Sequence, residues 1–98
     1  MQMKRNDNEL QRSLGRLLTA IQAEEMRAID TPAWAATHEA LRRTEYLYWA
    51  STRAALAATL GGASLRNYLG IEWLSRHPRV LPGLQDLELW VDEVQRQA

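Results

Sequence analysis

The sequence of 98 residues has no cysteine and no phenylalanine, and it holds only three prolines and five glycines. The absence of cysteine excludes a disulfide framework and any metal site that depends on thiolate ligands. No apolar run approaches the roughly 20 residues that a membrane-spanning helix needs, and no signal peptide is recognisable. We therefore expect a cytoplasmic protein that does not bind a membrane.

An excess of charge of either sign is also missing, because twelve basic residues balance twelve acidic ones. A neutral chain has no general attraction to nucleic acids or to anionic membranes. The composition, 46 % hydrophobic and 24 % charged, is typical of a globular protein, and its arginine, alanine and leucine content suggests a bacterial or phage origin. The length predicts a single helical domain over residues 1–98, with residues 1–5 flexible.

Hydrophobic spacing predicts that the first helix begins at the capping residue Asn6 and ends near Asp30. Its apolar stripe comprises Leu10, Leu14, Leu17, Leu18, Ile21, Ala28 and Ile29. A second helix is predicted to start at Pro32 and to run without interruption to Leu60, where two glycines stop it. These two helices should form a long antiparallel hairpin.

Two shorter helices complete the prediction. One is capped by Ser64 and runs from Leu65 to about Arg76. The other begins near Pro82, and its heptad-like seam comprises Val80, Leu84, Leu87, Val91 and Val94. Residues 85–95 could also be read as a strand, but an isolated strand would have no partner. The predicted fold class is therefore all-α, a small bundle of three to four helices built on the hairpin.

The predicted second helix is apolar on two sides, with a bulky face that includes Trp34, Trp49 and Leu56 and a mostly small face opposite. A helix that is apolar all round is normally surrounded by protein. We therefore expect a homodimer, with the small face at its interface, although packing of this face within one chain stays open. The expected dimer residues are Ala40, Leu47, Ala54 and Ala58. The four tryptophans, Trp34, Trp49, Trp73 and Trp90, are expected in or near the core.

No motif for catalysis or for a cofactor is recognisable. The only histidines, His38 and His77, belong to neither of the two histidine patterns that helical metal sites use. The chain also lacks a nucleophile elbow. We therefore expect no catalytic residue, no cofactor and no metal, and we do not expect an enzyme. A helical bundle that binds a small ligand through His38 and Glu45 is a second alternative.

A DNA-binding regulator is the first alternative. Residues 56–61 and 64–69 resemble a helix-turn-helix motif with its turn at Gly61. The match is degenerate, because later core positions of the motif fall on Asn67 and Gly70, where apolar residues are required. Binding to nucleic acid is therefore possible on this pattern but not favoured.

The strongest functional signal is the abundance of arginine, tryptophan and tyrosine, the residue types enriched at the energetic centres of protein interfaces. Some of the arginines project opposite the leucine stripe of the first helix, where a merely solvated face is the alternative. We predict a non-enzymatic protein-binding module, a small regulator, inhibitor or adaptor that occupies the surface of a partner protein. Its predicted partner-binding residues are Arg12, Arg16, Arg27, Arg42, Arg43, Tyr46, Trp49 and Arg53.

Overall fold

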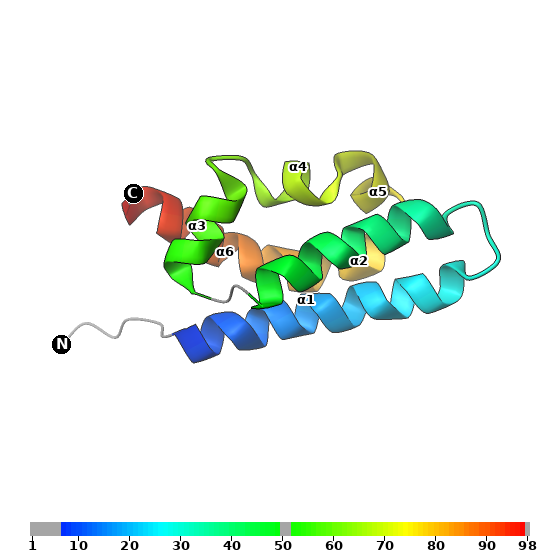
Figure 1. Ribbon diagram of the computed structural model, residues 1–98, viewed down its shortest axis with the longest axis horizontal. Coiled ribbons are helices and arrows are strands. Elements are labelled where there is room, and N and C mark those ends of the chain that lie inside the picture. The colour runs from blue at the N-terminus through cyan, green and yellow to red at the C-terminus, as the bar shows by residue number, and fades with distance from the viewer. Residues whose placement is uncertain (1–6, 50–51, 98) are drawn as a thin grey trace.

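The structure is a computed structural model that describes residues 7–49 and 52–97 (Figure 1). Its helices are α1 (Asp7–Ala28), α2 (Trp34–Trp49), α3 (Arg53–Leu60), α4 (Leu65–Leu69), α5 (Ile71–Ser75), the 3-10 turn η1 (Pro78–Val80) and α6 (Leu81–Gln97). The described residues contain no strand, so the predicted all-α bundle is confirmed. The number of helical segments is larger than expected because two of the predicted helices are broken.

The antiparallel hairpin of α1 and α2 is the frame of the molecule, and α6 packs along α1 (Figure 1). The apolar stripe of α1 lies in the core, where Leu10, Leu14 and Leu17 are fully buried. Ile29 was expected in this stripe but is 55 % exposed. The helix ends at Ala28 and Asp30 has a φ of 63°, so Ile29 lies in the turn and no longer follows the helical period. The predicted cap Asn6 and the expected flexible residues 1–5 lie outside the described residues.

The prediction of an uninterrupted second helix is wrong, because α2 ends at Trp49 and α3 begins at Arg53. Thr52 caps the new helix, and its hydroxyl oxygen accepts a hydrogen bond from the Ala55 amide at 3.1 Å. The break lets α3 pack against α6 and bury its own leucines. The predicted stop is confirmed, since Gly61 adopts the left-handed conformation with a φ of 56°.

The structure also shows which side of α2 is buried within one chain. Ala40 and Leu47, two of the expected dimer residues, are each 1 % exposed within the single chain. The other two, Ala54 and Ala58, are exposed on α3. The homodimer itself stays a prediction, and of its expected interface residues only the two on α3 are exposed in the single chain.

Two of the four tryptophans are not in the core. Trp34 is 41 % exposed and Trp49 is 80 % exposed, because they lie at the two ends of α2 and not along its buried face. Trp73 and Trp90 are buried, as expected.

The third predicted helix is also divided. Gly70, with a φ of 110°, separates α4 from α5. The predicted cap is confirmed, because the Ser64 hydroxyl oxygen accepts a hydrogen bond from the Asn67 amide at 3.1 Å. The last predicted helix is present as α6, and every residue of its heptad seam is buried, so residues 85–95 are helix and not strand. None of the described helices is both long and apolar enough to cross a membrane.

Candidate partner-binding surface

The exposed side of α1 carries two adjoining hollows, of about 350 and 510 Å³. Arg12 and Gly15 contribute to both, so the two hollows form one shallow groove along the helix. We call it the Arg12 groove, and it is lined by Asn8, Gln11, Arg12, Gly15, Arg16, Thr19 and Tyr48. Six of these residues come from α1 and Tyr48 comes from the neighbouring α2.

The depth of the groove depends on Gly15. A Cβ atom at this position would lie 3.7 Å from the Cε2 atom of Tyr48, which is ordinary van der Waals contact. A larger side chain would fill the space between α1 and the tyrosine ring. The glycine therefore keeps the floor of the groove open, although glycine weakens the interior of a helix relative to alanine.

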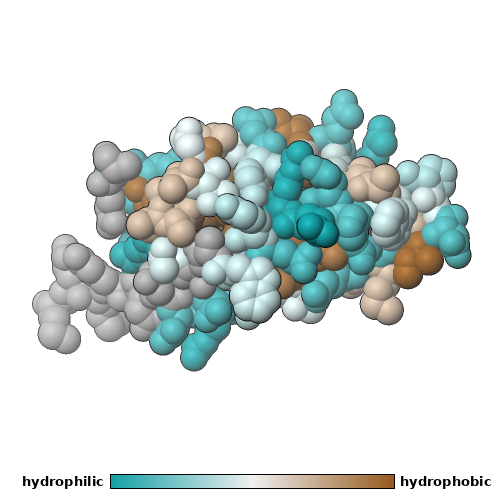
Figure 2. Space-filling view, viewed as in Figure 1, coloured by the Kyte–Doolittle hydropathy of each residue, from teal (hydrophilic) through white to brown (hydrophobic). Residues whose placement is uncertain are grey.

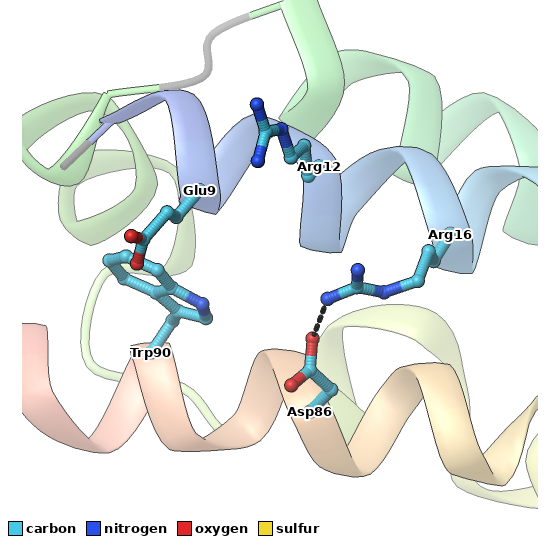
Figure 3. Close-up of a pocket in the computed structure, with 5 residues that line it drawn as sticks. All are labelled: Glu9, Arg12, Arg16, Asp86 and Trp90. Atoms are coloured by element: carbon cyan, nitrogen blue, oxygen red, sulfur yellow. Dashed lines mark hydrogen bonds and ion pairs between the residues drawn. The ribbon is translucent and has the colours of Figure 1, made fainter. Parts of the chain in front are cut away.

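Arg16 is held in place from α6. Its Nη2 atom donates a hydrogen bond of 2.7 Å to Oδ2 of Asp86 (Figure 3). The buried Ser13 hydroxyl donates to the same oxygen, also at 2.7 Å. The carboxylate thus links two positions on α1 to α6. Arg16 uses only one of its N–H donors in this bond, and its side chain stays mostly exposed.

A third hollow, of about 310 Å³, lies on the α6 side of the same arginines, between α1 and α6 (Figure 3). It is lined by Glu9, Arg12, Arg16, Asp86 and Trp90. In Figure 3 the Glu9 side chain extends from α1 toward α6, which carries Trp90, and the Asp86 carboxylate faces Arg16. This hollow contains two carboxylates and the same two guanidinium groups that line the Arg12 groove, so the charges of its described lining residues balance.

Aromatic side chains border the groove at the end of α2. The ring of Tyr48 lies edge-on to the ring of Trp49, with centroids 5.5 Å apart and planes at 79°. Trp49 is largely exposed. Tyr46 is also exposed, but it lines a separate hollow with Ala58, Thr59 and Tyr68. Of the predicted residues, Arg12 and Trp49 therefore lie beside Tyr48, and Arg16 continues the groove along α1.

The other predicted arginines lie elsewhere or serve the fold. Arg27 pairs with Glu24 near the far end of α1. Arg43 donates hydrogen bonds to the Tyr68 carbonyl at 2.8 Å and to Glu39 at 3.0 Å, which ties α2 to α4.

Arg53 on α3 is largely enclosed. Its guanidinium lies 5.4 Å from the centre of the Trp90 ring, and its Nη2 atom lies 3.9 Å from a carboxylate oxygen of Glu93. Two of its nitrogen atoms are buried and have no hydrogen-bond partner among residues 7–49 and 52–97. This arginine therefore joins α3 to α6. Arg42 is exposed on α2.

One exposed apolar surface was not anticipated from the sequence. At the loop between α1 and α2, the exposed hydrophobic side chains are Met26, Ile29 and Trp34. Figure 2 shows hydrophobic residues at this end of the molecule, beside an otherwise largely hydrophilic face. The only signal in the sequence is the turn predicted at Pro32, because apolar residues next to a turn between two helices can lie outside the core.

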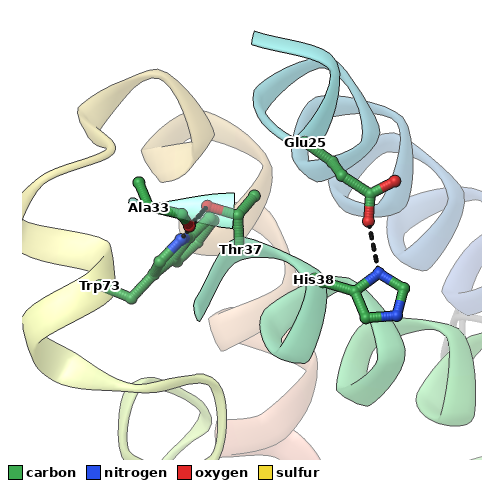
Figure 4. Close-up of polar contacts among 5 residues, drawn as sticks. All are labelled: Glu25, Ala33, Thr37, His38 and Trp73. Carbon is green, nitrogen blue, oxygen red and sulfur yellow. Dashed lines mark hydrogen bonds and ion pairs between the residues drawn. The ribbon is translucent and has the colours of Figure 1, made fainter. Parts of the chain in front are cut away.

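The contacts in the structure give little support to the two alternative functions, a small-ligand site at His38 and Glu45 and a helix-turn-helix at Gly61. Nδ1 of His38 lies 2.8 Å from a carboxylate oxygen of Glu25 (Figure 4). The imidazole also stacks on the Trp34 ring, with centroids 4.7 Å apart. Glu45 is half-buried. Within residues 7–49 and 52–97, no group of three or more histidine, cysteine, aspartate or glutamate residues could hold a metal ion.

The DNA-reading helix of the other alternative would be α4, which has only five residues. Arg66, its candidate base-reading side chain, donates hydrogen bonds of 2.9 and 3.1 Å to the two carboxylate oxygens of Glu88. This pairing raises the pKa of Arg66 and occupies the donors that would read a base.

Comparisons with known protein families, with curated proteins and with solved structures give no significant match to this chain.

Proposed function

We propose that this chain is a non-enzymatic protein-binding module that acts by occupying the surface of a partner protein. One observation carries the proposal. Trp49 presents most of its ring to solvent at the end of a helix, beside a groove that contains two arginines. An exposed tryptophan leaves a large apolar area in water, and tryptophan, tyrosine and arginine contribute most to binding energy at protein interfaces.

The positions of these side chains support the same proposal. Arg16 is fixed by Asp86, and Tyr48 is fixed between Trp49 and the floor of the groove. Side chains that are ordered before binding lose less conformational entropy when the partner arrives. The surface is therefore suited to recognition and not only to solubility.

Site-specific photo-crosslinking in the source cells tests the proposal. A photoreactive phenylalanine analogue replaces Trp49 in one variant and the exposed Arg76 in a control variant. We expect a protein adduct of defined mass from position 49 only, and excess wild-type protein should compete it away while Trp49→Ala protein does not. An adduct pattern that is the same at positions 49 and 76 would contradict the proposal.

A further inference from the structure

We infer that the Arg12 groove receives an acidic segment of the partner protein, whose carboxylates bind Arg12 and the exposed side of Arg16. The inference rests on the proposed function and adds the chemistry of the partner. Its first support is the charge of the groove. Among the described residues that line the groove, Arg12 and Arg16 are the charged ones, and none of the lining residues described is a carboxylate. In a chain of zero net charge, the groove therefore presents two guanidinium groups side by side.

The neutral residues of the groove also suit a carboxylate or a peptide. Asn8 and Gln11 carry amide N–H donors, and Tyr48 carries a hydroxyl donor. Guanidinium groups bind carboxylates through paired N–H donors, with geometry that a lysine cannot reproduce. Asp86 occupies one N–H donor of Arg16 from the hollow on the other side, and the other N–H donors of this mostly exposed guanidinium remain for a carboxylate of the partner.

The dimensions favour a short extended segment. From Asn8 to Thr19 the groove follows eleven residue steps of α1, or about 17 Å at 1.5 Å per residue. An extended peptide covers about five residues in that length, at roughly 3.3 Å each. The Gly15 floor leaves room for its backbone or for a small side chain, and Trp49 at the edge offers an apolar contact next to the acidic residues.

Nucleic acid fits the same groove less well. A duplex presents a dense array of phosphates and is bound by many cations at once. Here the carboxylates of Glu9 and Asp86 lie immediately beside the two arginines, in the neighbouring hollow. These carboxylates would repel the phosphates of a duplex that extends beyond the groove. A protein segment, in contrast, can place one or two carboxylates on the arginines and continue with neutral residues.

Selection from a random peptide library displayed on phage tests the inference. The targets are the wild type, Arg12→Glu and the control Arg79→Glu, which makes the same charge change at an exposed position of η1. We expect the wild type and Arg79→Glu to enrich peptides rich in aspartate and glutamate. A synthetic peptide of the enriched sequence should lose at least about tenfold in affinity for Arg12→Glu, and circular dichroism should show that each variant keeps its helices.

A second variant separates the groove from general surface charge. Gly15→Leu keeps both arginines but fills the floor beside Tyr48, so it should also weaken peptide binding. The inference is overturned if no peptide is enriched, if enriched peptides lack acidic residues, or if they bind Arg12→Glu as well as the wild type. It is also overturned if the groove instead binds duplex DNA with a steep salt dependence that Arg12→Glu removes.

The outcome also distinguishes this inference from the proposed function. If Arg12→Glu protein still competes for the adduct formed at position 49, the binding module stands and the acidic segment does not. If position 49 gives no specific adduct and no peptide is enriched, both fail.

Discussion

Two parts of the molecule contribute to one core in different ways. One part is the pair of long helices α1 and α6, and the other is the segment between them, from α2 to α5. The helices α1 and α6 are unbroken, and each buries apolar residues at helical spacing, such as Leu14 on α1 and Leu87 on α6. The middle segment is apolar on several sides, and it breaks after Trp49 and at Gly70. Each short piece then buries some of its apolar residues, such as Leu47, Leu56 and Leu74, and leaves others, such as Trp49, exposed. A helix that seems to need a second chain to cover it can thus be buried by breaking within one chain.

The largest expected effect tests the periodic side of this comparison. Leu87→Ala should lower the free energy of unfolding by about 2–5 kcal/mol, because Leu87 is fully buried in the middle of α6. Leu89→Ala, two residues away and 55 % exposed, should change it by less than about 0.5 kcal/mol. Chemical denaturation measures both, and equal losses would mean that the register of α6 is wrong.

The second prediction concerns the polar bonds of the broken segment. Trp73 donates a hydrogen bond from Nε1 to the Thr37 hydroxyl at 2.9 Å, and Thr37 is fully buried (Figure 4). Thr37→Val leaves the indole N–H without a partner and should cost about 1–3 kcal/mol. Thr44→Val is the matched control, since the equally buried Thr44 hydroxyl donates only to the Ala40 carbonyl in its own helix. A loss for Thr44→Val as large as that for Thr37→Val would contradict the assigned role of Trp73.

The third prediction compares a glycine in each of the two long helices. A Cβ on Gly83 would lie 3.3 Å from the Cα of Leu17, where α6 approaches the backbone of α1, so Gly83→Ala should destabilise the protein by about 1 kcal/mol or more. A Cβ on Gly15 meets only the edge of Tyr48, so Gly15→Ala should stabilise it by about 0.5–1 kcal/mol. Thermal unfolding of both variants measures these two changes in stability, which should have opposite signs. Changes of the same sign would contradict the difference between the closely packed contact of α1 with α6 and the open groove.

The smallest expected effect depends on pH. Burial raises the pKa of Tyr68, whose hydroxyl donates a hydrogen bond of 3.2 Å to the Arg43 carbonyl. Since the folded state holds this proton more tightly than the unfolded chain does, its contribution to stability is complete below the ordinary tyrosine pKa of about 10 and declines as the pH rises above it. Unfolding free energies at pH 9 and pH 11 should therefore differ less in Tyr68→Phe than in the wild type. An unchanged difference would show that Tyr68 titrates normally.

Local patterns in the sequence were enough to predict several elements. The leucine stripe of α1, the heptad seam of α6, the Ser64 cap and the stop at Gly61 depend on residues within a few positions of one another. Helical periodicity and capping are short-range effects, so they can be read from the sequence alone. The presence of arginines on the exposed side of α1 was predictable for the same reason.

The tertiary structure decided which surfaces those residues form. Arg16 and Asp86 lie 70 positions apart in the chain, and their pairing exists only because α6 packs along α1. The break between Trp49 and Arg53 lets α3 pack on α6, and no local pattern in the sequence predicted it. The groove over Gly15 needs Tyr48 from another helix to form its wall. The sequence by itself determined most of the helices and their apolar faces. The site was determined by contacts between helices that are distant in the chain, because these contacts depend on how the helices cross and how closely their backbones approach.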